Sequence, residues 1–155
     1  MKPQIGITEK NLALSIEMLS TILADEMILY VKTRKFHWNV SGESFMELHQ
    51  LFQRQYEALE QLIDSIAERI SKLGGKTIGT MHEFNNLTRL KESPNKYPSQ
   101  KEMLKELLTD YEALIVEIRE DIDSSKHKDV VTIDFLTKIM EQHETTAWVL
   151  RRYLN

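Results

Sequence analysis

Cysteine is absent from the 155-residue chain, which excludes disulfides, thiolate metal sites and cysteine nucleophiles. Any metal must therefore bind to histidine, aspartate or glutamate. Long apolar runs are absent too: none approaches the roughly 18 residues of a membrane-spanning helix, and MKPQIGITEK lacks the apolar centre of a signal peptide. We expect a cytoplasmic protein that does not contact a membrane.

A basic tail is also missing. The net charge is −4, Lys2 is the only lysine ahead of the first expected helix, and the chain ends in RRYLN. A protein that neutralises few phosphates binds DNA weakly at physiological salt. We therefore do not expect direct DNA binding.

Glycine and proline are scarce, with 5 and 3 residues, and apolar residues between them recur at three- and four-residue spacing. This pattern predicts an all-α fold. The expected long helices cover about 8–36, 44–73, 99–124 and 130–153, with one short helix, within MHEFNNLTRL, in the long connection between the second and third. Four helices with one long connection predict a four-helix bundle of ferritin-like connectivity, as a single domain over residues 1–155.

Local signals predict where these helices begin and end. Thr8 is the expected N-cap of the first helix, and the third should open with a capping box between Ser99 and Glu102. The double glycine at 74 and 75 should end the second helix. Phe45 and the apolar residues that follow it at helical spacing are expected to face the core.

Histidine and acidic residues around the second helix form the main candidate site. FHWNVSGESFMELH contains His37 and His49, and Asp64 and Glu68 stand four apart on one helix face. Two imidazoles and two carboxylates suit a non-haem iron site. None of the five histidines follows a glutamate by three residues, so the Glu-x-x-His pairs of an iron site inside one bundle are missing.

Helix geometry separates these residues within one chain. His49 and Asp64 are fifteen residues apart, which on a helix means about 22 Å. If second helices of two chains pack antiparallel about a two-fold axis near Tyr56 and Glu57, His49 of one chain comes level with Asp64 of the other. His37 could complete each site if the NVSG turn folds back beside His49. Geometry allows this arrangement without requiring it.

Structural interpretations compete with the metal site. Acids four apart beside an apolar stripe, such as Asp64 and Glu68, usually form a solvated helix face, and histidines near a core edge are usually packing residues. Trp38 and Trp148 are expected in the core. In EQHE, at 141–144, the histidine and the acids point to different faces of a helix, so we expect these residues at the surface.

FHWNVSGESFMELHQLF and DSIAERISKLGG resemble the Dps family of ferritin-like mini-ferritins, and the likeness extends over nearly the whole chain. VTIDFLTKIMEQHETTAWVLRRYL is similar to the last helix of that family. The resemblance implies a hollow homo-dodecamer with ferroxidase sites at its two-fold interfaces. It also implies that Asp64 and Glu68 of one subunit and His37 and His49 of its partner bind iron at two positions per site, with Glu68 as the bridge.

The resemblance further implies oxidation of Fe(II) to Fe(III) by hydrogen peroxide or oxygen, deposition of ferric mineral in the shell, and protection against oxidative stress. Trp38 would trap stray oxidising equivalents. Asp134, in TID, matches a residue that lines three-fold pores for iron uptake, and Asp129 is a nearby acid. Asp129 could equally be a favourable charge at a helix N-terminus.

One residue departs from the family pattern. Gln53 stands four residues after His49, where the family generally has an acid. Its amide oxygen is a weaker ligand than a carboxylate, so we expect the second iron to bind weakly. Two alternatives stay open: a shell that protects DNA physically, which the missing basic tail disfavours, and a helical oligomer that has lost the chemistry, which Gln53 supports.

Overall fold

The computed structural model describes residues 3–124 and 129–155, so Lys2 lies outside the described residues. This part of the chain forms only α-helices, and none of them is long and apolar enough to cross a lipid bilayer. The helices are α1 (Glu9–Asn39), α2 (Phe45–Lys72), α3 (Met81–Leu87), α4 (Gln100–Ser124) and α5 (Val130–Leu154). The prediction of an all-α fold with a short helix in the long connection is confirmed.

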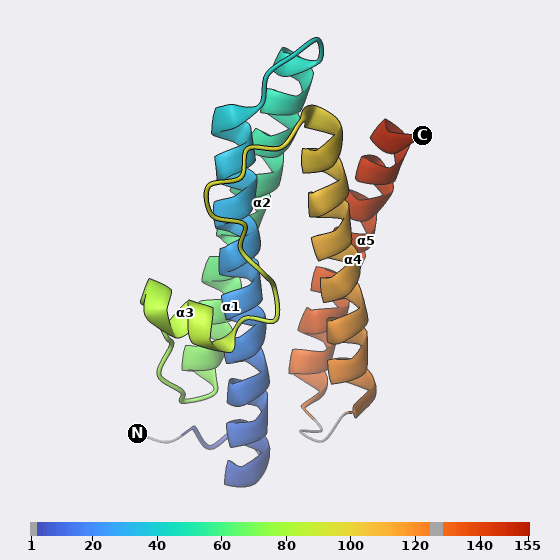
Figure 1. Cartoon of the computed structure of the whole chain (residues 1–155). Coiled ribbons are helices and arrows are strands. Elements are labelled where there is room, and N and C mark those ends of the chain that lie inside the picture. Colours follow the sequence, from blue (N-terminus) through green and yellow to red (C-terminus); the bar gives the residue numbers. More distant parts are fainter. Residues whose placement is uncertain (1–2, 125–128) are drawn as a thin grey trace.

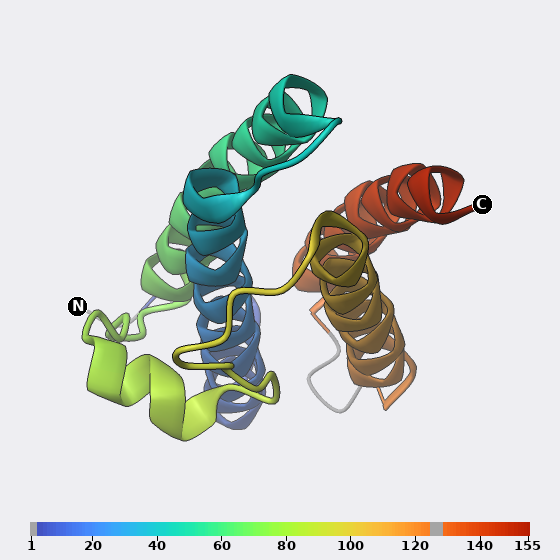
Figure 2. The same cartoon turned by 45° about the horizontal axis from the view of Figure 1, so that its top comes forward.

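Two antiparallel hairpins make up the bundle. One joins α1 to α2 and the other joins α4 to α5, while α3 lies beside α1 (Figure 1). The connection after α3 runs along α1 toward the start of α4, at the same end of the molecule as the α1–α2 turn. Figure 2, in which the top of the molecule comes forward, shows the α1–α2 hairpin beside the α4–α5 hairpin. This arrangement is the predicted four-helix bundle with one long crossover.

The predicted helix starts are confirmed. The Asn11 amide donates to the Thr8 side chain at 3.3 Å, and Thr8 has extended backbone angles, as an N-cap should. At the start of α4 the Ser99 amide donates to the Glu102 carboxylate at 2.9 Å, and the Glu102 amide donates back to the Ser99 hydroxyl at 3.4 Å. A second capping box, between Thr80 and Glu83 at α3, was not predicted.

The double glycine ends α2 through two backbone hydrogen bonds. Gly74 has a φ of +85°, its amide donates to Ser71 at 2.9 Å, and the Gly75 amide donates to Ile70 at 3.0 Å. This is the Schellman arrangement, in which glycine adopts left-handed angles without a steric cost. A Cβ atom on Gly75 would lie 3.0 Å from Ile16, so the second glycine lets the end of α2 pack closely on α1.

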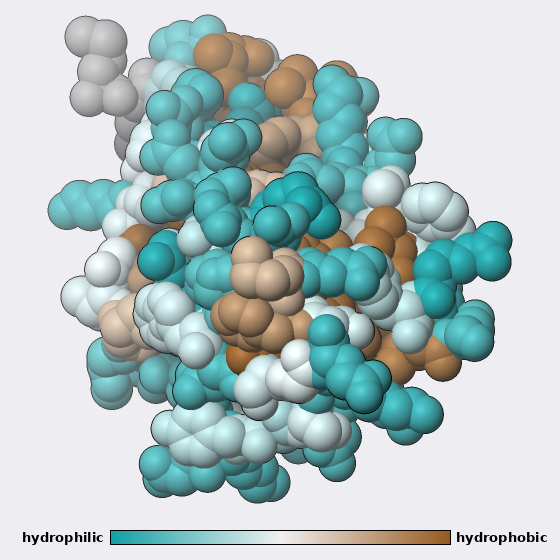
Figure 3. Space-filling view, turned by 90° about the horizontal axis from the view of Figure 1, so that it is seen from above, coloured by the Kyte–Doolittle hydropathy of each residue, from teal (hydrophilic) through white to brown (hydrophobic). Residues whose placement is uncertain are grey.

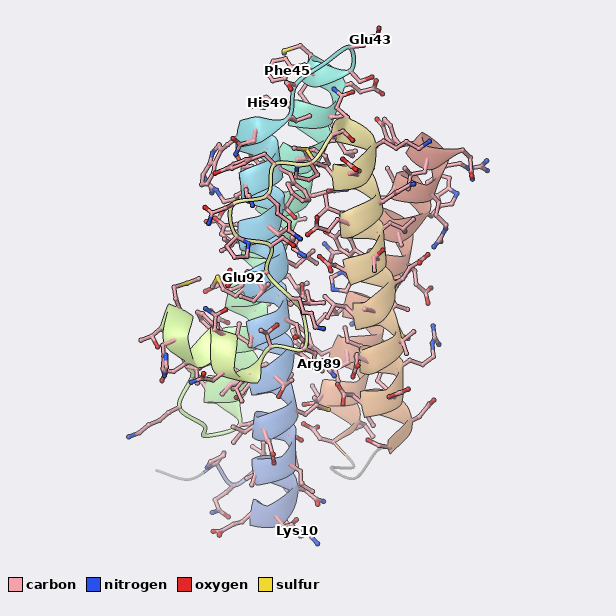
Figure 4. The ribbon with its side chains drawn as sticks, in the orientation of Figure 1. Lys10, Glu43, Phe45, His49, Arg89 and Glu92 are labelled. Atoms are coloured by element: carbon pink, nitrogen blue, oxygen red, sulfur yellow. The ribbon has the colours of Figure 1, made fainter. Side chains whose placement is uncertain are left out.

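Buried polar side chains of α1 hold the long connection on the bundle. The Arg89 side chain donates from Nε to the fully buried Asp25 carboxylate at 2.8 Å, where the connection crosses α1 (Figure 4). Farther along, Lys32 Nζ donates to the Lys91 carbonyl at 3.0 Å and to the Asp110 carboxylate at 2.6 Å. Burial raises the pKa of Asp110, although the Lys32 ammonium acts in the opposite direction.

A polar pair divides the core into two apolar clusters. One cluster contains Ile28 and Ala147, the other contains Ala24 and Ile139, and between them the His143 ring lies 2.6 Å from the Glu26 carboxylate. The prediction that residues 141–144 lie at the surface is therefore wrong for His143, which is 1% exposed. His143 continues the buried stripe of α5, and Glu26 on α1 supplies the hydrogen bond that makes its burial tolerable.

The prediction that both tryptophans and Phe45 pack in the core is wrong for the isolated chain. Trp38 is 64% exposed, Trp148 is 53% exposed and Phe45 is 40% exposed. Each tryptophan directly follows a buried residue, and one residue rotates a side chain by about 100° around a helix. Figure 3 shows apolar atoms exposed among hydrophilic side chains at the end of the molecule that carries the α1–α2 turn.

Candidate metal centre

His37 and His49 meet where α1 ends and α2 begins. The turn between the helices folds back, so the two rings stack with 3.8 Å between their centroids and 20° between their planes. His37 is buried and His49 is half-buried in the first turns of α2, near Phe45 (Figure 4). The two histidines are thus neighbours although they are 12 residues apart in sequence.

Reciprocal hydrogen bonds orient the two rings. His37 Nδ1 lies 2.8 Å from the carbonyl oxygen of His49, and His49 Nδ1 lies 2.9 Å from the carbonyl oxygen of His37. A carbonyl oxygen can only accept, so each Nδ1 carries the proton. In the neutral rings each Nε2 therefore keeps its lone pair, which is the form of imidazole that binds a metal.

Asp64 and Glu68 lie on the exposed surface of α2. Glu68 accepts a hydrogen bond from Lys72 at 2.8 Å, and this bond lowers the pKa of Glu68. The Asp64 side chain makes no hydrogen bond or ion pair with other described residues. Both carboxylates are therefore accessible, one of them held by a lysine that a metal would have to displace.

One chain does not bring the histidines and the acids together. His49 and Asp64 lie on the same straight helix about 22 Å apart. Among the residues that the structure describes, no three histidine or acidic side chains are close enough to share a metal ion. The histidine pair and the acid pair are therefore two separate groups of candidate ligands, which we call the candidate half-sites.

Gln53 lies one turn after His49 and is half-buried. Its amide nitrogen donates to the Glu57 carboxylate at 2.8 Å. Residue 53, where the family pattern has an acid, is therefore a neutral amide in this chain. The next negative charge along this helix face belongs to Glu57, one turn farther on.

A ferritin-like domain model matches residues 16–155. The chain is 36% identical over 142 residues to DNA protection during starvation protein 2 of Bacillus anthracis, covering 90% of this chain and 96% of that protein. The chain belongs to the Dps family of ferritin-like proteins. This membership supports a role in iron storage and DNA protection in general terms. An uncharacterized low temperature-induced protein of Nostoc sp. PCC 7120 is 44% identical over 152 residues, covering 97% of this chain and 85% of that protein.

Solved Dps structures match the bundle closely. DpsC from Streptomyces coelicolor has a TM-score of 0.95 at 27% identity, covering 100% of this chain and 91% of that one. A Dps protein from Bacillus brevis has a TM-score of 0.90 at 30% identity, covering 96% of this chain and 100% of that one. The ferritin-like fold and the resemblance seen in the sequence are both confirmed.

In this Dps chain an aromatic cluster surrounds Arg34 beside the histidine pair. The Arg34 guanidinium lies 4.5, 5.2 and 5.5 Å from the ring centres of Tyr56, Trp38 and Tyr30. It also donates to the Tyr30 hydroxyl at 2.7 Å, and this bond raises the pKa of Arg34. Tyr56 meets the His37 ring edge to face at 5.2 Å. The predicted radical trap, Trp38, therefore lies in one contact network with a candidate ligand.

The two acids considered for a pore have different surroundings. Asp134 is exposed and accepts from Lys138 at 2.8 Å. Asp129 is buried, caps α5, and accepts from Arg69 at 2.6 Å and from the Thr132 hydroxyl. Burial acts to raise the pKa of Asp129, but these hydrogen bonds outweigh it and lower the pKa. Asp129 thus fills the structural role of a helix N-cap.

The buried Glu26 and His143 pair is the polar feature that sequence reasoning missed. His143 stands four residues after buried Ile139 and four before buried Ala147, so the apolar spacing itself indicated a buried position. Tyr111 packs edge to face against the His143 ring, with 5.2 Å between the ring centroids. Burial raises the pKa of the Tyr111 hydroxyl. This cluster lies inside the bundle, away from the candidate metal centre.

Proposed function

We propose that this chain forms a hollow dodecameric shell that oxidises Fe(II) with hydrogen peroxide, or with oxygen, and stores the ferric product as mineral. Iron is the substrate of the shell. The observation that carries the proposal is the stacked pair of His37, on α1, and His49, on α2, in which each Nε2 keeps its lone pair. The accessible acids Asp64 and Glu68 lie on the same helix as His49, with Asp64 about 22 Å from it. We propose that each 155-residue chain acts as one domain in the cytoplasm.

A two-fold axis near Tyr56 and Glu57 would unite the half-sites. Antiparallel α2 helices there would bring His49 of one chain level with Asp64 of the other, and each pair of chains would hold two equivalent sites. Support comes from the exposed face of α2, which carries the acids on a continuous helix, and from membership in the Dps family. The fixed spacing along one rigid helix would set the distance between the two sites.

The residues would divide the chemistry between them. His37 and His49 supply neutral nitrogen ligands whose orientation is fixed before iron arrives. Asp64 and Glu68 supply negative charge, which favours Fe(III) over Fe(II) and so favours oxidation. Two Fe(II) ions give one electron each to one hydrogen peroxide, which takes up two protons and leaves as two waters.

Three further residues complete the proposal. Gln53 would make the second iron position weak, because it offers an amide oxygen without a formal charge. Trp38 would intercept oxidising equivalents that escape the site, which its contact with Arg34 beside His37 supports. Asp134 would line a pore for iron uptake, and its exposure supports that role. Asp129 is the lesser pore candidate, because its carboxylate already caps α5.

The decisive experiment mixes two inactive kinds of chain. One carries His37→Ala and His49→Ala, the other carries Asp64→Ala and Glu68→Ala, and the two are unfolded, mixed and reassembled. Shared sites require about a quarter of all sites to be complete in an equal mixture, because half of the pairs are mixed and one of their two sites is intact. The ferric absorbance after Fe(II) and peroxide should therefore grow at about a quarter of the native rate.

Each pure variant shell should oxidise iron at the protein-free rate. A mixed shell that stays at that rate would show that the two half-sites do not meet, and the proposal would fail. If the native shell itself does not exceed the protein-free rate, the chain has lost the chemistry, and the helical-oligomer alternative becomes the better one.

DNA protection is the second candidate, because the relative from Bacillus anthracis is named for it. A net charge of −4 per chain disfavours direct binding. We propose that any protection is chemical, through removal of Fe(II) and peroxide. A gel shift of the assembled shell at physiological salt tests this, and a retarded DNA band would favour the physical shield.

A further inference from the structure

The amide of Gln53 is tied to an acid on its own helix. Gln53 Nε2 donates to Glu57 Oε1 at 2.8 Å, and this is the only hydrogen bond of the Gln53 side chain among the described residues. His49 lies one turn before Gln53 and Glu57 one turn after it, so the three side chains follow one another along one helix face. The amide thus stands between a candidate ligand and a carboxylate.

The hydrogen bond fixes which way the amide faces. A carboxylate can only accept, so the NH₂ group of Gln53 must point to Glu57. The carbonyl oxygen, the only atom of this side chain that can bind a metal, is then the free end. An amide without such a partner could turn over and present its NH₂ group, which cannot act as a ligand.

The same hydrogen bond makes the carbonyl oxygen a better ligand. An N–H group that donates to a negative acceptor shifts amide electrons toward its oxygen, and hydrogen bonds in series polarise one another in this way. Mutating a group that hydrogen-bonds to a metal ligand, without contacting the metal, commonly lowers metal affinity by about 10–100-fold. The hydrogen bond to Glu57 therefore partly compensates for the absence of a carboxylate at residue 53.

We propose that Glu57 is a positioning residue for the second iron position, where it orients and polarises the Gln53 amide so that the carbonyl oxygen is offered to Fe(II). This proposal rests on the ferroxidase function proposed above. The negative charge that the family pattern expects at residue 53 is carried at residue 57, about 6 Å farther along α2. Glu57 acts through Gln53 and is not itself a ligand.

Two other acids of α2 are held by different partners. Glu47 accepts from the Tyr153 hydroxyl at 2.8 Å, across the bundle end, and Glu68 accepts from Lys72 at 2.8 Å. Among the described acids of α2, Glu57 is the one that accepts a hydrogen bond from a candidate ligand. The hydrogen bond from Gln53 thus distinguishes Glu57 from the other acids of α2.

A double-mutant cycle tests the claim by anaerobic titration calorimetry of assembled shells with Fe(II) alone. Glu57→Leu should weaken the second position at least about tenfold and leave the first unchanged. In the Gln53→Asp background, the same Glu57→Leu change should cost less than about threefold, because a carboxylate needs no partner to present an oxygen. The general effect of losing the Glu57 charge on Fe(II) affinity is the same in both backgrounds, so it cancels when the two losses are compared.

Two further variants sharpen the comparison. Glu57→Gln keeps an acceptor for the Gln53 amide but loses the charge, so its effect should lie between those of native protein and Glu57→Leu. Glu141→Leu removes one exposed acid from α5 and should change Fe(II) affinity at neither position. Circular dichroism and shell size confirm that each variant folds and assembles.

Equal losses of second-position affinity in both backgrounds would show that Glu57 binds iron directly or acts only through the electrostatic field of its charge. Either result would overturn the proposal. Unchanged affinity after Glu57→Leu would overturn it as well. A native shell that binds Fe(II) at neither position would overturn the proposed ferroxidase function together with this inference. A native shell with a normal first position and no dependence on Glu57 would overturn the inference alone.

Discussion

The imidazole rings of His37 and His49 each donate from Nδ1 to the backbone carbonyl of the other residue, at 2.8 and 2.9 Å. These two bonds close the α1–α2 turn and at the same time fix the protonated nitrogen of each ring. The candidate ligands are therefore part of the structure of the turn. A metal would meet two nitrogens already in place, with little rotamer freedom left to lose.

Removing either ring should impair iron oxidation without unfolding the turn. His37→Ala leaves the carbonyl of residue 37 as the acceptor for His49, and His49→Ala does the same for His37, so the remaining ring keeps its orientation. We expect either change to lower the initial rate of ferric absorbance growth at least about tenfold. His82→Ala, at an exposed histidine of α3, is the control and should leave the rate unchanged. Equal rates in all shells would exclude the histidine pair.

Lys72 should compete with iron for Glu68. The hydrogen bond at 2.8 Å ties up one carboxylate oxygen, and breaking it frees the ligand. Because exposed ion pairs are weak, Lys72→Met should raise Fe(II) affinity only about two- to fivefold, measured by anaerobic calorimetry. Lys101→Met, an exposed lysine of α4, controls for the loss of a positive charge. A lower affinity in Lys72→Met would mean that Lys72 positions Glu68 for binding.

Asp134 and Lys138 should have opposite effects on iron uptake. Their side chains are 2.8 Å apart on the exposed face of α5, so the lysine offsets the acid's attraction for Fe(II). Asp134→Asn should slow ferric accumulation in the shell and Lys138→Gln should speed it, while shell size stays the same. Stopped-flow absorbance at low ionic strength measures both. Identical uptake in the two variants would remove Asp134 from the route of iron.

The buried pair of Glu26 and His143 should show strong coupling. Glu26→Leu leaves a buried histidine without its partner and should lower the free energy of unfolding by about 3–5 kcal/mol. Replacing both residues with leucine should recover much of this loss, because no unpaired polar group remains. Guanidinium unfolding at fixed subunit concentration gives the comparison. Additive losses in the double variant would contradict the coupling.

Asp129 should stabilise the protein at neutral pH and lose its effect in acid. Its pKa is lowered in the folded state, where hydrogen bonds from Thr132 and Arg69 outweigh burial. The stabilisation is therefore complete above the unfolded pKa of about 3.9 and disappears as pH falls through the lower folded pKa. Asp129→Asn should be less stable than the native protein at pH 7, and the gap should narrow below about pH 3.9. Thermal unfolding across pH measures it, and a constant gap would contradict the assignment.

Helix bounds could be predicted from the sequence because local interactions set them. Thr8 caps α1 with a bond to a residue three positions away, Ser99 and Glu102 cap each other, and glycine at 74 permits a backbone that other residues resist. The spacing of apolar residues then gave the number of helices and the long connection. The motif around His37 and His49 similarly placed the candidate ligands and the family.

Only the tertiary structure decided which side chains are enclosed and what they touch. The buried His143 ring finds its polar partner only in the folded chain, where Glu26, 117 residues away in sequence, meets it across the bundle. Trp38 and Trp148 are exposed because, in the described part of the chain, no other helix covers their faces of α1 and α5. The sequence by itself determined the helices and the candidate iron ligands, since both depend on short-range spacing and chemical type. Packing between helices decided burial, ring orientation and hydrogen-bond partners, since these depend on groups that the chain brings together only when it folds.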